Sequence, residues 1–180
     1  MITKRRAVSK RQAGMSPWLM IAGIVVGSQV LVYETEVSER TRLYREAKDL
    51  ATSVGKPMLL VGMPKGIAGQ TPCSTGITLD IDPKVADACG IGGIGADVQS
   101  IPYPSGYFGS VAAFHVLEHL PDLESAQRAW RELWRVTATR VFVAYPRRWN
   151  LYATYLQPEH HLWVQPMGVN GEVVHVIERE

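Results

Sequence analysis

Cysteine is scarce in this sequence, and an excess of charge of either sign is absent. The 180 residues include two cysteines, Cys73 and Cys89, and no C-x-x-C pair. So few cysteines imply no disulfide framework, and we expect both thiols to be free. The formal net charge is +2 at pH 7, so composition gives no reason to expect a nucleic-acid partner, and we expect none. The length is sufficient for one domain with a hydrophobic core.

Charged residues are also missing from residues 17–33, which follow a basic tail at residues 1–14. The segment PWLMIAGIVVGSQVLVY is at the short end of the roughly 17–25 residues that span a bilayer as a helix. Trp18 and Tyr33 lie at its two ends, where aromatic side chains favour the membrane interface. We therefore predict a hydrophobic helix over residues 15–33 that crosses a membrane once. Two alternatives stay open: a buried or interfacial helix, and a cleaved signal peptide, although no small-residue cleavage site follows.

The remainder, residues 34–180, has the pattern of one α/β domain. Apolar residues recur every three or four positions in residues 34–54 and 121–135, which predicts two helices with one buried face each. The charged residues of the first helix, Arg40 among them, are expected on its solvated face. Short apolar runs predict strands at residues 58–62, 77–81, 107–114 and 140–145, with one more strand-like piece at residues 172–177. We expect an open, mostly parallel, Rossmann-like sheet of about six strands with flanking helices, shortened at its C-terminus and preceded by the hydrophobic helix.

Glycines and carboxylates follow the predicted strands at the points where these strands end. A glycine-rich stretch at residues 62–76 comes after the first strand, Asp80 ends the second, and Asp97 precedes a proline loop. Because ligands of open α/β sheets bind at the carboxyl ends of the strands, these residues predict a binding site there. A strand, a glycine turn and an acid about 20 residues later form a nucleotide-binding layout. Glycine-rich stretches are also common in ordinary loops, so this signal is weak alone.

Two further segments make the pattern more specific: HVLEHL at residues 115–120 and PEHHLW at residues 158–163. With Asp97 and its proline loop, they resemble the class I S-adenosylmethionine-dependent methyltransferases, in particular the broad small-molecule branch called type 11. The resemblance covers about residues 58–164. It implies S-adenosylmethionine as the cofactor, with Gly62 and Gly66 under its methionine part, Asp80 at the ribose, Asp97 at the adenine amino group, Val98 beside the ring, and His115 lining the pocket. On the substrate side it implies His119, His160 and His161.

Histidines are the candidate proton acceptors of such a site, and no single catalytic residue is assigned. Methyl transfer needs a general base only when the nucleophile carries a proton at working pH, and histidine titrates near neutrality when unperturbed. Residues 115–119 also fit the H-x-x-E-H pattern of zinc proteases. The match follows a buried strand and is closed by Pro121, whereas the metal-binding pattern needs the interior of a long helix. We therefore expect no metal.

Two functions are compatible with these residues. The first is a membrane-attached methyltransferase, tethered through residues 17–33, that acts on a small-molecule or lipid-linked acceptor. The second is a catalytically inactive domain of the same fold, serving as a membrane-tethered structural or interaction subunit for a protein partner. Leu60 stands where the family has an acid, and Pro64 replaces a central glycine and has no N–H to donate. These two departures favour the second function.

The charge distribution leaves the side of the membrane undecided. Five basic residues precede the hydrophobic segment and four follow it closely. An excess of basic residues normally marks the cytoplasmic flank of a membrane-spanning helix, and here this excess is small. An active domain needs a cytosolic metabolite as its cofactor, and this requirement puts the domain on the cytosolic side.

Overall fold

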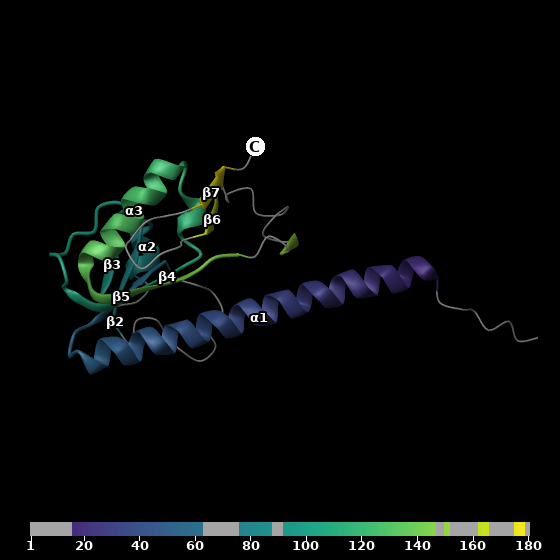
Figure 1. Cartoon of the computed structure of the whole chain (residues 1–180), viewed down its shortest axis with the longest axis horizontal. Helices are drawn as coiled ribbons and strands as arrows, with labels where there is room; N and C mark the ends of the chain where they lie inside the picture. Colours follow the sequence, from purple (N-terminus) through teal and green to yellow (C-terminus); the bar gives the residue numbers. More distant parts are fainter. Residues whose placement is uncertain are drawn as a thin grey trace, which may run out of the picture.

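One long helix begins the computed structural model. The structure describes residues 16–62, 76–87, 92–146, 150–151, 162–165 and 175–178. Helix α1 (Pro17–Ser53) runs without a break from the hydrophobic segment into the domain (Figure 1). The helices expected at residues 15–33 and 34–54 are therefore a single helix, because no proline follows Pro17 until Pro57 to interrupt the backbone hydrogen bonds.

The two halves of α1 have opposite surroundings. Residues 17–28 are all exposed, including Trp18 and Ile24, whereas Tyr44 and Ala47 in the second half are completely buried. In the described part of the chain, α1 is the one helix that is long and apolar enough to cross a membrane, judged by length and composition. The apolar residues of its first half therefore contribute nothing to the core of this domain.

Five parallel strands form the main sheet. In spatial order they are β3 (Gly93–Gly95), β2 (Gly76–Asp80), β1 (Met58–Val61), β4 (Phe108–Phe114) and β5 (Thr137–Ala144). Every neighbouring pair is parallel, and the residues of β1 and β4 are buried throughout, as their uninterrupted apolar runs predict. The expected Rossmann-like architecture, an open parallel sheet with flanking helices, is confirmed.

The expected number of about six strands in this sheet is wrong for the described residues. β6 (Leu162–Gln165) and β7 (His175–Glu178) pair antiparallel with each other in a separate two-stranded sheet. The strand-like piece expected at residues 172–177 overlaps β7 in its described part, and the partner of that strand is β6 instead of the main sheet. The short strand β3, with its sequence Gly-Ile-Gly, was not among the expected strands.

The main sheet lies between two layers of helix. Helix α3 (Leu123–Val136) covers one face with Ala126, Ala129 and Leu133, and α1 covers the other face. Successive side chains of a strand point to opposite faces, so Leu59 packs in the α3-side cluster and Leu60 in the α1-side cluster. Two short elements, α2 (Pro83–Asp87) and the 3₁₀ turn η2 (Leu117–His119), follow strands β2 and β4.

Small residues bring α1 unusually close to β4. A Cβ atom added at Gly109 would lie 2.8 Å from the Ala51 Cα atom and 2.8 Å from Val54 Cγ2. One residue further along, the buried Ser110 hydroxyl donates a hydrogen bond of 2.6 Å to the Ala47 carbonyl oxygen. The helix backbone and the strand backbone are therefore in direct contact, and a larger residue on either side would separate them.

Replacing Gly109 with alanine should destabilise the domain. The added methyl group would overlap backbone atoms of α1, and overpacking of this kind typically costs about 1–3 kcal/mol. Urea unfolding of the full chain in detergent micelles, followed by near-ultraviolet circular dichroism, measures the change. Gly27→Ala is the matched control, because a Cβ atom there meets nothing within 4 Å. Equal unfolding curves for the two variants would contradict the close α1–β4 contact.

Candidate functional site

A cavity of about 620 Å³ opens at the carboxyl ends of β1, β2, β3 and β4. Its volume is within the range typical of small-molecule sites, roughly 300–1,000 Å³. Six of the residues expected to bind cofactor or substrate line it: Gly62, Asp80, Asp97, Val98, His115 and His119. The other three, Gly66, His160 and His161, lie outside the described residues, as does Pro64. The structure therefore brings the described candidates together at one edge of the sheet.

Two carboxylates lie on the β2–β3 side of this cavity. Asp80 ends β2, and its Oδ1 atom accepts a hydrogen bond of 2.9 Å from the Asp82 N–H. Asp97 follows β3, and its Oδ1 atom accepts a hydrogen bond of 2.8 Å from the Gln99 N–H. Each carboxylate is oriented by the backbone and keeps further lone pairs, because a carboxylate can accept about four hydrogen bonds. Both can therefore bind donor groups of a ligand.

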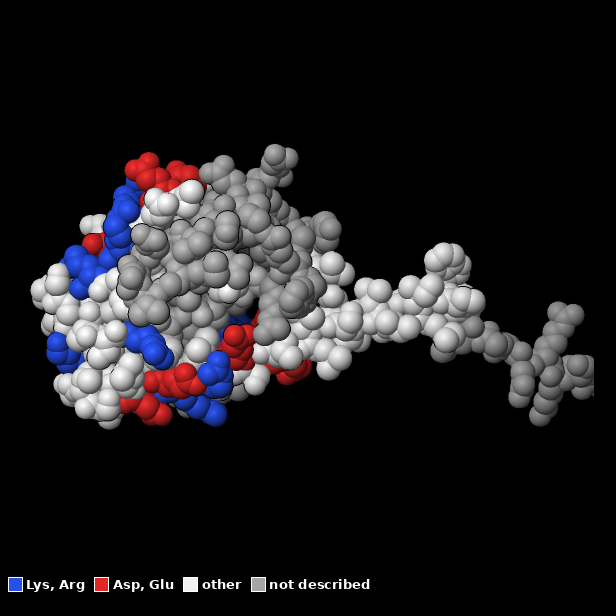
Figure 2. Space-filling view, in the orientation of Figure 1, with Lys and Arg blue, Asp and Glu red and all other residues white. Residues whose placement is uncertain are grey.

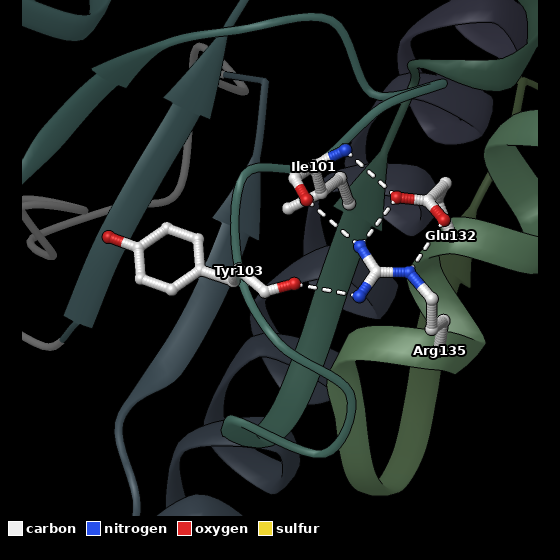
Figure 3. Close-up of polar contacts among 4 residues, drawn as sticks. All are labelled: Ile101, Tyr103, Glu132 and Arg135. Atoms are coloured by element: carbon white, nitrogen blue, oxygen red, sulfur yellow. Dashed lines mark hydrogen bonds and ion pairs between the residues drawn. The ribbon is translucent and has the colours of Figure 1, made fainter.

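An ion pair on α3 holds the loop that carries Asp97. Figure 3 shows Arg135 and Glu132 reaching the backbone of Ile101 and Tyr103. The Arg135 guanidinium donates to the Tyr103 carbonyl at 2.7 Å and to the Ile101 carbonyl at 2.9 Å. Glu132 Oε2 accepts from the Ile101 N–H at 2.9 Å, and the two side chains bind each other through two further contacts of 2.6 and 2.7 Å. The loop is thus bound at three backbone atoms.

The same ion pair shifts the titration of both partners. Hydrogen bonds from Arg135 lower the pKa of Glu132, and the Ile101 N–H acts in the same direction. The hydrogen bonds to Glu132 raise the pKa of Arg135. Both groups therefore remain charged across the neutral range, and the clamp on the loop is retained there.

Gly62 lies where β1 ends and the cavity begins. Its φ angle is 72°, in the left-handed region that glycine adopts without cost, and a Cβ atom there would lie 2.9 Å from Val116 Cγ2. Its N–H donates to the Leu79 carbonyl at 2.8 Å. The glycine thus allows the chain to leave the sheet at the end of β1, in a space bounded by the ends of β2 and β4.

His115 and Glu118 form a pair at the end of β4. The His115 Nδ1 atom is 3.3 Å from Glu118 Oε1, a distance that suits an ion pair, although no contact with hydrogen-bond geometry reaches this oxygen. Glu118 is only 1% exposed. His115 has a φ angle of 55°, and its N–H donates to the Ala144 carbonyl at 2.8 Å. A strained, non-glycine backbone beside a cavity is typical of functional sites.

The H-x-x-E-H segment does not have the geometry of a zinc-protease helix. Residues 115 and 116 form an irregular turn, and residues 117–119 form the 3₁₀ turn η2. The two histidines therefore do not lie one helical turn apart on a single α-helical face. Within the described ranges, no three His, Cys, Asp or Glu side chains gather in a way that could hold a metal ion.

One charged residue of the cavity was not anticipated from the sequence. Arg40 lines the cavity from α1 and is only 9% exposed, so its assignment to the solvated face of the helix is wrong. The apolar periodicity of residues 34–54 gave no signal for this, because Arg40 sits one turn before Tyr44 on the buried face. Its neighbour Arg42 does lie on the solvated face, paired with Glu46 at 2.6 Å.

Comparison with known proteins finds a family model that matches the region around the cavity. Residues 64–144, which include β2 to β5 and most of the cavity, match the family model described as a methyltransferase domain. This region is similar to methyltransferase domains, and the match covers somewhat less than half of the chain. A crystal structure of the cyclase SpnF is similar to the chain with 21% sequence identity and a TM-score of 0.38, over 55% of this chain and 41% of that chain. The chain thus spans about two fifths of the cyclase's length. No curated protein matches the chain.

The ion pair between Glu132 and Arg135 on α3 should stabilise the domain in a pH-dependent way. Glu132→Gln should lower the free energy of unfolding at pH 7 by about 1–3 kcal/mol, because hydrogen bonds to charged groups are lost. The folded-state pKa of Glu132 is lowered, so its contribution is present above the ordinary glutamate pKa of about 4.3. This stabilising contribution is lost as the pH falls through the lower, folded-state pKa of Glu132. The difference in free energy of unfolding between Glu132→Gln and the wild type should therefore become smaller below about pH 4.

Thermal unfolding between pH 3 and pH 7 measures this difference, with Glu124→Gln as the control. Glu124 pairs with Arg128 on the same helix, but its side chain is 78% exposed. Such surface pairs contribute about 0–1 kcal/mol. A Glu132→Gln deficit that stays constant across this pH range would contradict the role assigned to the ion pair.

The backbone of His115 should favour glycine over alanine. Both His115→Gly and His115→Ala remove the imidazole, but only glycine adopts the observed φ of 55° without steric cost. We expect the glycine variant to be more stable than the alanine variant by roughly 1 kcal/mol. Thermal unfolding of the two variants side by side measures this, and an alanine variant of equal stability would show that the turn is not strained.

Proposed function

We propose that the protein is a membrane-attached methyltransferase that uses S-adenosylmethionine. The observation that carries this proposal is the cavity at the strand ends, in a region that matches a methyltransferase-domain model. The cavity gathers Gly62, Asp80, Asp97 and His115 from four separate segments of the chain. In open parallel sheets this edge is where ligands bind.

The donors and acceptors of the cavity fit the adenosine end of the cofactor. A ribose diol and an adenine amino group are hydrogen-bond donors, and the two carboxylates of Asp80 and Asp97 are acceptors that follow neighbouring strands. Val98 lines the cavity beside Asp97 and is 7% exposed, which suits an apolar contact with a ring. We assign Asp80 to the ribose, Asp97 and Val98 to the adenine, and Gly62 to the methionine side.

The chain's own residues would orient the reactants, exclude water and accept a proton. When bound, S-adenosylmethionine supplies an electrophilic methyl group on a sulfonium. We assign the role of base to His115, because it lines the cavity and its Nδ1 atom is 3.3 Å from Glu118 Oε1. With a proton on Nδ1, Nε2 would accept the proton of an acceptor hydroxyl or amine. His119, an exposed residue of the cavity wall, would contact the acceptor.

Membrane attachment is supported by the continuity of α1. The exposed apolar half and the half that packs on the sheet belong to one helix, Pro17–Ser53. Removal of residues 17–33 as a signal peptide would require a cut within this helix, and the apolar half makes no contribution to the core. We therefore favour a single-pass anchor. The cofactor is a cytosolic metabolite, so an active domain would face the cytosol.

An inactive domain of the same fold is the second candidate, and Leu60 is the residue that favours it. Its side chain is 1% exposed and packs in the α1-side cluster with Tyr44 and Phe114. A carboxylate at this position would be buried among apolar groups, so the chain offers no substitute for the family's acid there. Such a domain would hold a protein partner at the membrane.

Titration of the full chain in detergent micelles with S-adenosylmethionine separates the two candidates. Asp80→Asn should weaken binding roughly tenfold or more, because a charged acceptor for the ribose hydroxyls is lost. Asp82→Asn is the matched control, because it makes the same change of charge two residues later. In the wild type, the Asp82 side chain accepts a hydrogen bond of 2.9 Å from the Lys84 N–H at the start of α2. Asp82→Asn should bind like wild type. A folded wild-type protein that binds no cofactor at millimolar concentration would support the inactive domain.

A further inference from the structure

The direction of α1 orients the cavity relative to the proposed membrane anchor. Helix α1 ends at Ser53, and β1 begins at Met58 after a short turn, so the C-terminal end of the helix lies at the amino end of the sheet. Arg40, earlier in the helix, lines the cavity at the carboxyl ends of the strands. The N-terminal part of α1, purple in Figure 1, projects beyond the sheet in the same direction. The cavity therefore lies on the side of the domain that faces the apolar half of the helix.

The separation between cavity and anchor is short. From Tyr33, which ends the segment without charged residues, to Arg40 the helix advances about 10 Å, at roughly 1.5 Å per residue. The polar layer of a bilayer extends several ångströms beyond each side of the roughly 30 Å hydrocarbon core. In Figure 2 the projecting part of the helix shows no Lys, Arg, Asp or Glu, and the charged residues begin where it meets the domain. A helix inserted up to Tyr33 thus brings the cavity close to the lipid headgroups.

Arg40 is a buried cation with no partner among the residues that the structure describes. It is 9% exposed. In the part of the chain that the structure describes, its guanidinium makes no hydrogen bond or ion pair, and no other Lys or Arg lines the cavity. A mostly buried guanidinium that lines a cavity is stabilised when an anion or hydrogen-bond acceptors in that cavity satisfy its donors. Its planar fork of donors matches a phosphate or a carboxylate.

We propose that Arg40 binds the acidic headgroup of a membrane lipid that enters the cavity from the bilayer surface as the acceptor or as part of it. The two carboxylates of the cavity are Asp80, which ends β2, and Asp97, which follows β3. Arg40 belongs to α1, which lies beside β1 and β4. An acidic group is repelled by the first region and attracted by the second. This inference rests on the membrane attachment proposed above and names the class of substrate for the same site.

Dioctanoyl phosphatidic acid, titrated into the full chain in neutral detergent micelles, is the probe that tests this role. It should raise the melting temperature of the wild type, because a ligand that binds the folded state stabilises it by mass action. Arg40→Gln should weaken the affinity about tenfold or more, and Arg40→Lys, which keeps the charge but not the fork, should retain part of it. Arg42→Gln is the matched control, because Arg42 lies on the same helix with an exposed side chain. It should bind like wild type.

Four results would overturn the inference. Equal affinities of Arg40→Gln and Arg42→Gln for the lipid would remove the role of Arg40. Equal binding of inorganic phosphate and dioctanoyl phosphatidic acid would indicate a site for a free anion, and equal binding of dioctanoyl phosphatidylcholine would show that the acidic headgroup is not read. An Arg40→Gln variant that loses affinity for S-adenosylmethionine, yet binds the lipid unchanged, would assign the guanidinium to the cofactor's carboxylate.

The same titrations keep this inference separate from the proposed activity. A wild-type chain that binds the acidic lipid through Arg40 but binds no S-adenosylmethionine would retain the lipid site and lose the methyltransferase assignment. A chain that binds the cofactor but no acidic lipid would retain the methyltransferase assignment and lose the lipid site.

Discussion

The contact between α1 and β4 is the constraint on which the arrangement of this protein depends. Gly109 allows the helix backbone to touch the strand, and the Ser110 hydroxyl joins the helix through the Ala47 carbonyl. Both interactions are buried and involve backbone atoms, so they fix the helix in position as well as in direction. The sheet then determines where the cavity opens, and the helix determines where the apolar segment points. A single interface thus relates the site to the proposed membrane.

The site itself combines a general property of parallel sheets with a local device. The sheet brings the carboxyl ends of β1, β2, β3 and β4 to one edge. Strand pairing alone therefore places Asp80 and Gly62 in the same cavity. The loop after β3 has no such support, because most of its residues lie outside regular structure. The Glu132–Arg135 pair supplies it by binding the loop backbone at Ile101 and Tyr103. Asp97 is therefore positioned from α3, across the sheet edge, as well as from its own strand.

Much of this arrangement could be predicted from residue patterns, because the pattern and its cause are local. Uninterrupted apolar runs identified β1, β2, β4 and β5, and the residues that follow these runs identified the cavity wall. The burial of Arg40 could not be predicted, because a charge on a helix is expected in solvent unless a ligand site faces it. The pairing of β6 with β7 was also missed, because strand partners are chosen by contacts distant in sequence. The binding roles of all nine site residues remain predictions, and Gly66, His160 and His161 also lie outside the described residues.

The order of the strands also bears on how the chain matures. The central strand β1 pairs with β4 across a long separation in sequence, since Met58 is in register with Ser110. During synthesis, at roughly 5–20 residues per second, β4 appears several seconds after α1 has left the ribosome. The buried face of α1, with Tyr44 and Ala47, has no sheet to cover it during this interval. On the proposed membrane attachment, the apolar half can enter the bilayer first, so the domain completes its fold as an already tethered chain.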